Sequence, residues 1–201
     1  MNTEPNGHPR NPEQTERAYG VPVGAGAIRF ERVLPGPIER VWAYLTDSEK
    51  RGRWLASGEM DLRVGGRVEL NFFHADLSPV VEEVPEKYRD MANGCSMTGR
   101  ITRCEPPYLL SYTWGGDMGE VSEVTFELTP LDGKVLLVLT HRKLGDDPAV
   151  LANVAAGWHT HLGILTDRLD GRQPRGFWSV HTWAEEAYEK RLSVQPHAAI
   201  R

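Results

Sequence analysis

The sequence predicts an α+β domain in which an antiparallel sheet is covered by one long helix near the C-terminus. Segments between residues 28 and 141 alternate apolar and polar side chains with a period of two, as half-buried strands do. Residues 147–169 instead repeat apolar side chains every three or four positions, which is the spacing of an amphipathic helix. Because a strand-rich sheet must bury its apolar face, we expect this helix to cover it.

The chain begins with an arm over residues 1–22 that contains four prolines and almost no apolar side chain. Such a segment cannot bury enough apolar surface to fold by itself, so we expect it to be disordered. The domain then starts at residue 23.

The first strand is predicted from Ile28 to Leu34, and Pro35-Gly36-Pro37 ends it. A helix follows from Ile38 to Thr46 with its apolar side chains on one stripe. Ser48 is a suitable cap for a second short helix that reaches Trp54.

The same alternation predicts five further strands, over residues 60–64, 67–74, 96–104, 108–114 and 122–129. Gly65-Gly66 supplies the turn between the first two of these strands. In the second, His74 shares the apolar face with Phe72.

Residues 76–94 interrupt the strands, and the interval from Pro85 to Gly94 has the composition of a short helix. An excursion of this length inside a compact domain is usually a lid or a binding loop, or else is disordered.

The pair Asp132-Gly133 is a strong signal for a two-residue hairpin turn. That turn would place Leu128 opposite Leu137, Phe126 opposite Leu139 and Val124 opposite His141, with His141 on the buried face. A shift of one residue would reverse the faces.

The long helix is predicted to follow the capping residues Asp146 and Asp147, with Pro148 in its first turn and Gly171 as its stop. Its apolar stripe is formed by Leu151, Val154, Trp158, Leu162, Leu165 and Leu169. After a linker over residues 171–176, a second amphipathic helix is predicted from Phe177 to Leu192.

Composition excludes several classes of protein. The formal net charge of −5 argues against nucleic acid or an anionic membrane as the partner, and no apolar run approaches the ~18 residues that span a bilayer. The first residues carry no apolar signal region. Cys95 and Cys104 lie at the two ends of one predicted strand, roughly 30 Å apart, so we expect no disulfide and a cytoplasmic location.

Five segments in order resemble the START-like (SRPBCC) superfamily, and within it the branch of activators of the heat-shock-protein-90 ATPase. They are VLPGPIERVWAYLTD, RWLASGEMDLRVGGRVEL, GRITRCEPPYLLSYTW, SEVTFELTP and GWHTHLGIL. The resemblance covers about residues 26–170 and continues into FWSVHTWAEEAYEKRL. It implies a helix-grip fold, in which a curved antiparallel sheet of about six or seven strands wraps around the long helix, with two short helices after the first strand. We therefore expect a START-like domain over residues 23–170 and a linker with an accessory helix over residues 171–201.

A helix-grip fold leaves a cavity wherever the facing side chains do not fill it, and sequence alone leaves an open pocket and a filled core as equal alternatives. Trp54 could stand at the pocket mouth or plug the end of the core. The candidate ligand-binding residues are Trp54, Tyr112, Trp114, Phe126, Leu139, His141, Trp158 and Leu162.

Histidines are the candidates for chemistry, since imidazole can exchange protons near neutral pH. His74 and His141 lie on apolar strand faces, where each could be a general base or a buried ring held by hydrogen bonds. His159 and His161 point apart on a helix, and there is no HExxH motif, P-loop or GxGxxG, so we expect no metal and no cofactor.

Three functions remain. The sequence favours a protein that binds a small hydrophobic or amphipathic molecule. The resemblance also implies an enzyme of the cyclase or dehydratase type that uses His74 or His141, or a co-chaperone-like module that contacts a chaperone. We expect no nucleic-acid or membrane partner, and a homodimer stays open.

Overall fold

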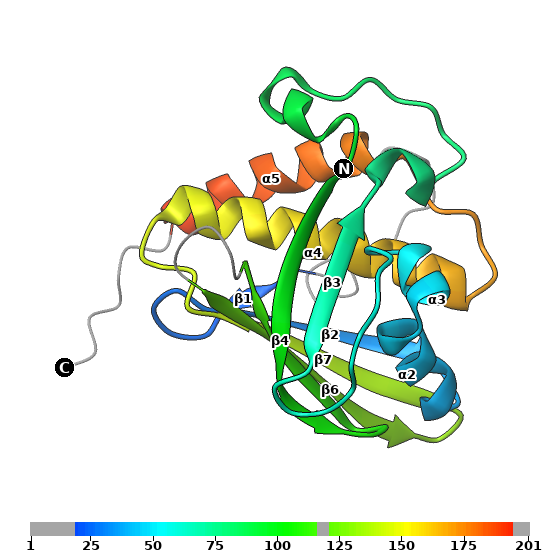
Figure 1. The fold of residues 1–201 in the computed structure, drawn as a ribbon. Coiled ribbons are helices and arrows are strands. Elements are labelled where there is room, and N and C mark those ends of the chain that lie inside the picture. The colour runs from blue at the N-terminus through cyan, green and yellow to red at the C-terminus, as the bar shows by residue number, and fades with distance from the viewer. Residues whose placement is uncertain (1–18, 116–120, 195–201) are drawn as a thin grey trace.

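The computed structural model describes residues 19–115 and 121–194, which form a curved antiparallel sheet with helices inside its concave face (Figure 1). The seven strands follow the order β1-β2-β7-β6-β5-β4-β3. Their bounds are β1 Val21–Pro22, β2 Ile28–Pro35, β3 Arg67–Phe72, β4 Cys95–Glu105, β5 Leu109–Trp114, β6 Ser122–Leu131 and β7 Lys134–Arg142. This arrangement confirms the predicted helix-grip fold.

Four α-helices and two short 3₁₀ helices complete the described part of the chain. Helices α2 and α3 follow β2, the 3₁₀ helices η1 and η2 lie between β3 and β4, and α4 and α5 come after the sheet. Their bounds are α2 Ile38–Thr46, α3 Ser48–Gly52, η1 His74–Leu77, η2 Glu86–Met91, α4 Pro148–Leu169 and α5 Phe177–Val194. None of these helices has the length and apolar character that would let it cross a membrane.

The hairpin between β6 and β7 has the predicted register. Leu128 pairs with Leu137, Phe126 with Leu139 and Val124 with His141 across the Asp132-Gly133 turn. Gly133 has a φ of 64°, which suits glycine in a tight turn. His141 consequently faces the interior and is 1% exposed.

Helix α4 begins and ends as predicted. The carboxylate of Asp147 accepts a hydrogen bond from the Ala149 amide at 2.8 Å, Pro148 occupies the first turn, and Gly171 has a φ of 71° beyond the last turn. These residues fix where helix α4 begins and ends along the sheet.

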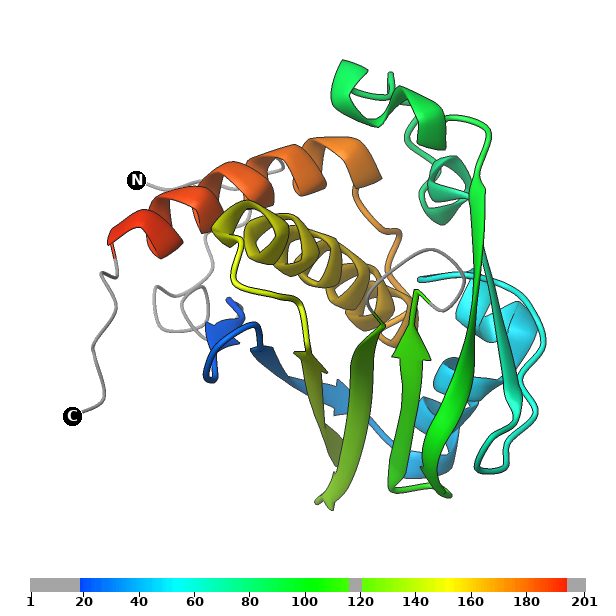
Figure 2. The ribbon, with the colours of Figure 1, turned by 60° about the vertical axis from the view of Figure 1, so that its left-hand side comes forward.

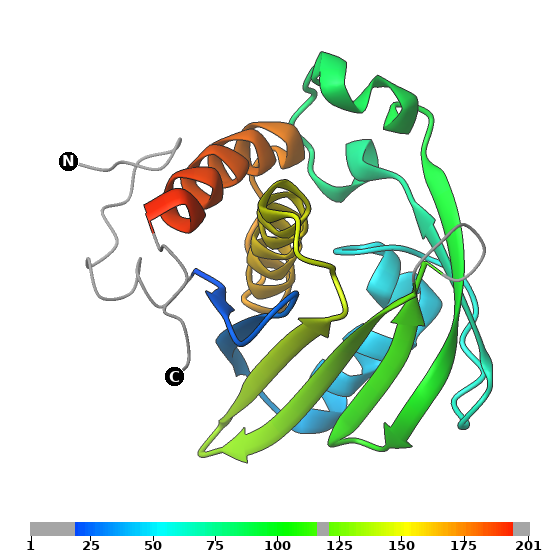
Figure 3. The ribbon, with the colours of Figure 1, turned by 90° about the vertical axis from the view of Figure 1, so that its left-hand side faces the viewer.

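The prediction of a single apolar stripe on α4 was incomplete. Ala155, His159 and Thr160 lie outside that stripe and are also buried. Helix α5 packs along the side of α4 that faces away from the sheet, as the view along α4 shows (Figure 3). Because the sheet and α5 cover α4 on two sides, residues around most of the helix are buried. Those residues must be small or apolar, or must have hydrogen-bond partners if they are polar.

Two further boundaries differ from the sequence prediction. Residues 60–64 do not form a strand, because the chain turns back at Asp61 and Arg63 after the isolated bridge between Met60 and Val68, and Val64 is 68% exposed. His74 was expected at the end of a strand, but β3 ends at Phe72 and His74 opens η1.

Residues 19–22, placed in the arm by the sequence, lie against the domain. β1 pairs with β2, the Gly20 amide donates to the Tyr188 hydroxyl at 2.7 Å, and the Tyr19 ring lies 5.4 Å from the Tyr188 ring. The rest of the predicted arm, residues 1–18, is outside the described residues.

A fully buried arginine joins the short helices to the edge of the sheet. The Arg51 guanidinium donates to the carbonyl oxygens of Thr46 at 2.9 Å, Ala56 at 3.1 Å and Gly58. These bonds hold the chain where it leaves α3 and approaches β3. Figure 2 shows the course of the backbone between these two elements.

We predict that Arg51→Met destabilises the fold by about 3 kcal/mol, because it leaves several buried carbonyl groups without donors. Urea unfolding measures the change. Arg53→Met is the control, since the Arg53 side chain is exposed and pairs with exposed Glu49, and it should change stability by less than about 0.5 kcal/mol. Equal effects of the two substitutions would contradict the role assigned to Arg51.

Candidate functional site

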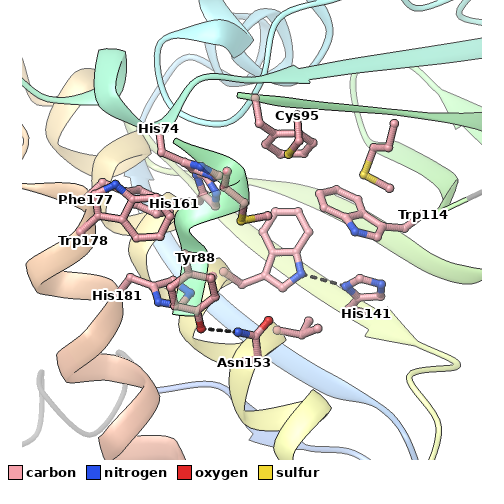
Figure 4. Close-up of a pocket in the computed structure, with 16 residues that line it drawn as sticks. His74, Tyr88, Cys95, Trp114, His141, Asn153, His161, Phe177, Trp178 and His181 are labelled. Atoms are coloured by element: carbon pink, nitrogen blue, oxygen red, sulfur yellow. Dashed lines mark hydrogen bonds between the residues drawn. The ribbon is translucent and has the colours of Figure 1, made fainter. Parts of the chain in front are cut away.

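A cavity of about 220 Å³ lies between one end of the sheet, α4, the start of α5 and the segment that connects β3 to β4 (Figure 4). Ten of the sixteen residues that line it carry aromatic or imidazole rings. The lining residues are Phe72, His74, Tyr88, Met91, Cys95, Met97, Trp114, His141, Asn153, Val154, Gly157, Trp158, His161, Phe177, Trp178 and His181.

Gly157 helps to keep this space open. It lies in the middle of α4 and lines the cavity, and a Cβ atom built on it would meet no atom within 4 Å. A larger residue at this position would project a side chain into the cavity. A glycine inside a helix lowers stability by roughly 0.5–1 kcal/mol relative to alanine. The presence of glycine at this position is therefore consistent with a need for open space rather than for helix stability.

A chain of hydrogen bonds fixes the floor of the cavity and the state of His141. The Trp158 indole N–H donates to His141 Nδ1 at 2.9 Å, so this nitrogen carries no proton. The neutral ring then holds its proton on Nε2, which lies 2.8 Å from Ser122 Oγ, and Ser122 in turn donates to the Trp114 carbonyl oxygen at 3.1 Å. Burial lowers the pKa of His141 to about 3, in agreement with a neutral ring.

Three more histidines lie together at another part of the wall. The His74 ring is 5.7 Å from the His161 ring and 4.2 Å from the Phe177 ring, and Phe177 stacks on His181 at 5.7 Å. Burial lowers the pKa of His74 and of His181 to about 4. Burial, with His74 nearby, lowers that of His161 to about 3. This wall is therefore uncharged at neutral pH.

The histidine rings differ in how their nitrogens are paired. His161 Nδ1 lies 2.7 Å from the Trp54 carbonyl oxygen and must donate to it, which leaves Nε2 as an acceptor in the neutral ring. Within the described part of the chain, Nδ1 of His74 and Nδ1 of His181 are buried without a hydrogen-bond partner. No three His, Cys, Asp or Glu side chains among the described residues are placed to hold a metal ion.

The segment between β3 and β4, for which the sequence left open a lid, a binding loop or a disordered stretch, lies over the cavity and is fastened at η2, and we call it the lid. Glu185 on α5 accepts from Lys87 Nζ at 2.6 Å, the Tyr88 hydroxyl at 2.8 Å and Asn153 Nδ2 on α4 at 3.1 Å. Burial alone would raise the pKa of the Glu185 carboxyl, but these three hydrogen bonds hold it below its usual value. We call this group of four residues the Glu185 latch.

The other end of the lid is attached to the start of α5. The Glu82 carboxylate accepts from the backbone amides of Trp178 at 2.8 Å and Ser179 at 3.2 Å, so it caps the helix from outside. Ser78 Oγ donates to the Pro174 carbonyl oxygen at 3.1 Å. The lid and the C-terminal helix therefore form one cover over the cavity.

The structure sorts the candidate residues into two groups. Trp114, His141 and Trp158 line the cavity, as does His74. The others lie in the packed core below it, where neighbouring side chains fill the space; they are Tyr112, Phe126, Leu139 and Leu162. Trp54 is also in the core, and its indole N–H donates to the Tyr44 carbonyl oxygen at 2.8 Å, so it plugs the end of the core.

Several lining residues that the sequence did not indicate come from the lid and from α5, and others, among them Asn153 and Gly157, come from α4. Tyr88 lies on η2, and Phe177, Trp178 and His181 lie on the first two turns of α5. Three rings within five residues at the start of a helix indicate that this part of the helix packs against other residues. Helical periodicity does not show which surface of the protein they contact. Cys95 and Cys104 are free thiols, and burial raises the pKa of each.

Comparison with known proteins places this geometry among relatives. The family of activator of Hsp90 ATPase homolog 1-like proteins matches residues 35–170. A solution NMR structure of a Bordetella parapertussis protein is 46% identical, covers 89% of this chain and 92% of its own, and has a TM-score of 0.73.

More distant structures share the architecture. CalU16 from Micromonospora echinospora is 25% identical, with 83% of this chain and 88% of that chain covered and a TM-score of 0.58. The Aha1 dimer from Colwellia psychrerythraea is 18% identical, with 71% and 95% covered and a TM-score of 0.53. No curated protein matches the chain.

We predict that acid weakens the fold through the buried histidines. Their pKa values lie below the usual 6.5, so their contribution to stability is fully present above about pH 6.5 and is lost as the pH falls toward 4. Between pH 7.5 and 5.0 each of these histidines should lower the free energy of unfolding by on the order of 1–2 kcal/mol. Urea unfolding at the two pH values measures this change.

The substitution His181→Phe keeps a ring in place and removes one titrating group. The loss of stability over the same pH range should then be smaller by the contribution of one histidine. A wild-type unfolding free energy that stays constant from pH 7.5 to 5.0 would contradict the prediction.

Proposed function

This chain belongs to the family of activator of Hsp90 ATPase homolog 1-like proteins, and from its cavity we propose that it binds a small apolar or amphipathic molecule between the sheet and the long helix. One observation carries the proposal. The cavity is lined mainly by aromatic rings and methionine side chains, and a small number of polar groups face it. Pockets that bind small molecules have this composition.

The size of the cavity supports a compact ligand. Apolar cavities of about 150 Å³ hold a benzene molecule, so a cavity of about 220 Å³ has room for a somewhat larger one. Burial of apolar ligand surface would supply the affinity, at roughly 25 cal/mol per Å². Met91, Met97 and Cys95 are adaptable side chains that can adjust to the outline of a guest.

The cover supports the same function. The lid is joined to α4 and α5 through the Glu185 latch, which is held by polar contacts near the surface, where Lys87 is 61% exposed. Polar contacts at a surface open at lower free energy than the packed core. The lid is therefore the part of the described chain best suited to admit a ligand.

Catalysis by a pocket histidine has less support. His141 has both ring nitrogens engaged, with Trp158 and Ser122. The pKa of His74 is lowered to about 4, and a general base works best with a pKa near the operating pH. A contact with a chaperone rests on the family description alone, and the outer face of β6 carries the carboxylates of Glu123 and Glu127.

We predict that Gly157→Leu weakens binding by filling part of the cavity from α4. Compounds are first identified by native mass spectrometry of gently purified protein and by a thermal-shift screen of fatty acids and aromatic molecules. The Kd of any such compound should rise at least about tenfold in this variant, since the leucine occupies the volume that the ligand needs.

Gly163→Leu is the matched control. Gly163 also lies on α4, a Cβ atom there also meets no atom within 4 Å, and Gly163 does not line the cavity. Both substitutions should raise helix stability by up to about 1 kcal/mol, but Gly163→Leu should leave Kd within about twofold. The proposal fails if the screen finds no ligand or if Gly157→Leu binds the ligand as the parent chain does.

A further inference from the structure

Building on the proposed function, we infer that the cavity takes a neutral aromatic molecule of about two fused rings whose hydroxyl group donates to Asn153 Oδ1, and that it rejects carboxylates. The inference names the chemical class of the ligand and one residue that selects it. It rests on the shape of the cavity, on the fixed orientation of one amide and on the absence of Lys, Arg, Asp and Glu among the described residues that line the cavity.

The first step is shape. Paired rings form much of the wall, with Tyr88 stacked on Trp178 at 5.3 Å, His74 stacked on Phe177 at 4.2 Å, and Trp114 tilted on Trp158 at 5.0 Å. Flat aromatic molecules make favourable offset and edge contacts with such walls. A volume of about 220 Å³, compared with about 150 Å³ for a benzene site, fits two fused rings and is too small for a long acyl chain.

The second step is the Asn153 amide. Its Nδ2 donates to the Glu185 carboxylate at 3.1 Å and to the Tyr88 hydroxyl at 2.6 Å (Figure 4). A charged carboxylate only accepts hydrogen bonds, so the amide cannot be turned over without losing this contact. Asn153 Oδ1 is therefore held on the other side of the amide, in a residue that lines the cavity, as an acceptor for a ligand O–H.

The third step is charge near Asn153. Glu185 sits behind the amide, and the Lys87 ammonium group that compensates it lies against Glu185 rather than in the cavity wall. A ligand carboxylate at Asn153 would meet an acceptor oxygen with a second carboxylate behind it. This arrangement favours a donor and repels an anion.

The fourth step is the rest of the wall. None of the sixteen lining residues is Lys, Arg, Asp or Glu. The histidine rings are held neutral by burial, and the indole N–H groups of Trp114 and Trp178 are neutral donors. An anion would enter without a counter-charge among these residues, which is unfavourable beside apolar and aromatic side chains.

Three probes of equal ring size test the inference at pH 7.5 by tryptophan fluorescence or calorimetry. They are 2-naphthol, its methyl ether 2-methoxynaphthalene, and 2-naphthoate. We expect 2-naphthol to bind about fivefold or more tightly than the ether, because of one hydrogen bond. We expect 2-naphthoate to bind at least about 100-fold more weakly than 2-naphthol, because its charge is unpaired.

Equal binding of the three probes, or tight binding of 2-naphthoate, would overturn the inference and leave the proposed function intact. If none of the three binds while another compound binds and is blocked by Gly157→Leu, the inference again fails alone. If no compound of any class binds, the proposed function fails as well.

Asn153→Leu and Asn153→Ala test whether Asn153 selects for a ligand hydroxyl. The measured quantity is the ratio of the affinities for 2-naphthol and its methyl ether, which does not change if a substitution alters entry to the cavity equally for both compounds. Both should bring the ratio of 2-naphthol to ether affinity close to one. Lys87→Met is the control, because it disturbs the same Glu185 latch without removing Asn153 Oδ1, and it should keep the parent ratio. A preserved preference in the folded Asn153 variants would overturn the role of Asn153.

Discussion

The Trp158–His141 hydrogen bond is the contact on which the site depends. It joins α4 to β7, continues through Ser122 to the Trp114 carbonyl oxygen, and thereby sets the distance between the helix and three neighbouring strands. The curved sheet turns away from α4 toward β4 and β3, as the view along the helix shows (Figure 3). Gly157, one residue before Trp158, leaves that diverging space unfilled, and the lid and α5 border it.

This construction pairs many of the polar side chains around the site with one another or with backbone carbonyl oxygens. Trp158, His141 and Ser122 satisfy one another, His161 donates to the Trp54 carbonyl oxygen, and the Glu185 carboxylate collects the donors of the lid. Buried polar groups that are paired in this way hold the walls rigid. What remains facing the cavity is mostly ring surface, with Asn153 Oδ1 at one side. A guest is therefore bound by shape and by few polar contacts.

Local sequence signals predicted the sheet well. The Asp132-Gly133 turn fixed the register, and the register placed His141 next to Trp114 and Trp158. The same alternation could not separate Trp114, at the open end, from Tyr112 and Phe126, whose surroundings are filled. An alternation with a period of two shows which face of the sheet a residue occupies. Whether the space in front of that residue is filled depends on side chains from α2 and α4, which the alternation does not show. The contributions of Phe177, Trp178 and His181 were hidden because helical spacing does not identify the surface that a helix meets.

The most direct test of the central claim is a crystal structure of the protein under xenon pressure, since xenon enters apolar cavities that side chains leave open. The account predicts a xenon site bounded by Trp158, Gly157 and Phe177, beneath the lid and above the His141 ring. A structure in which side chains of the lid or of α5 fill this space, with no xenon between α4 and β5, would contradict it.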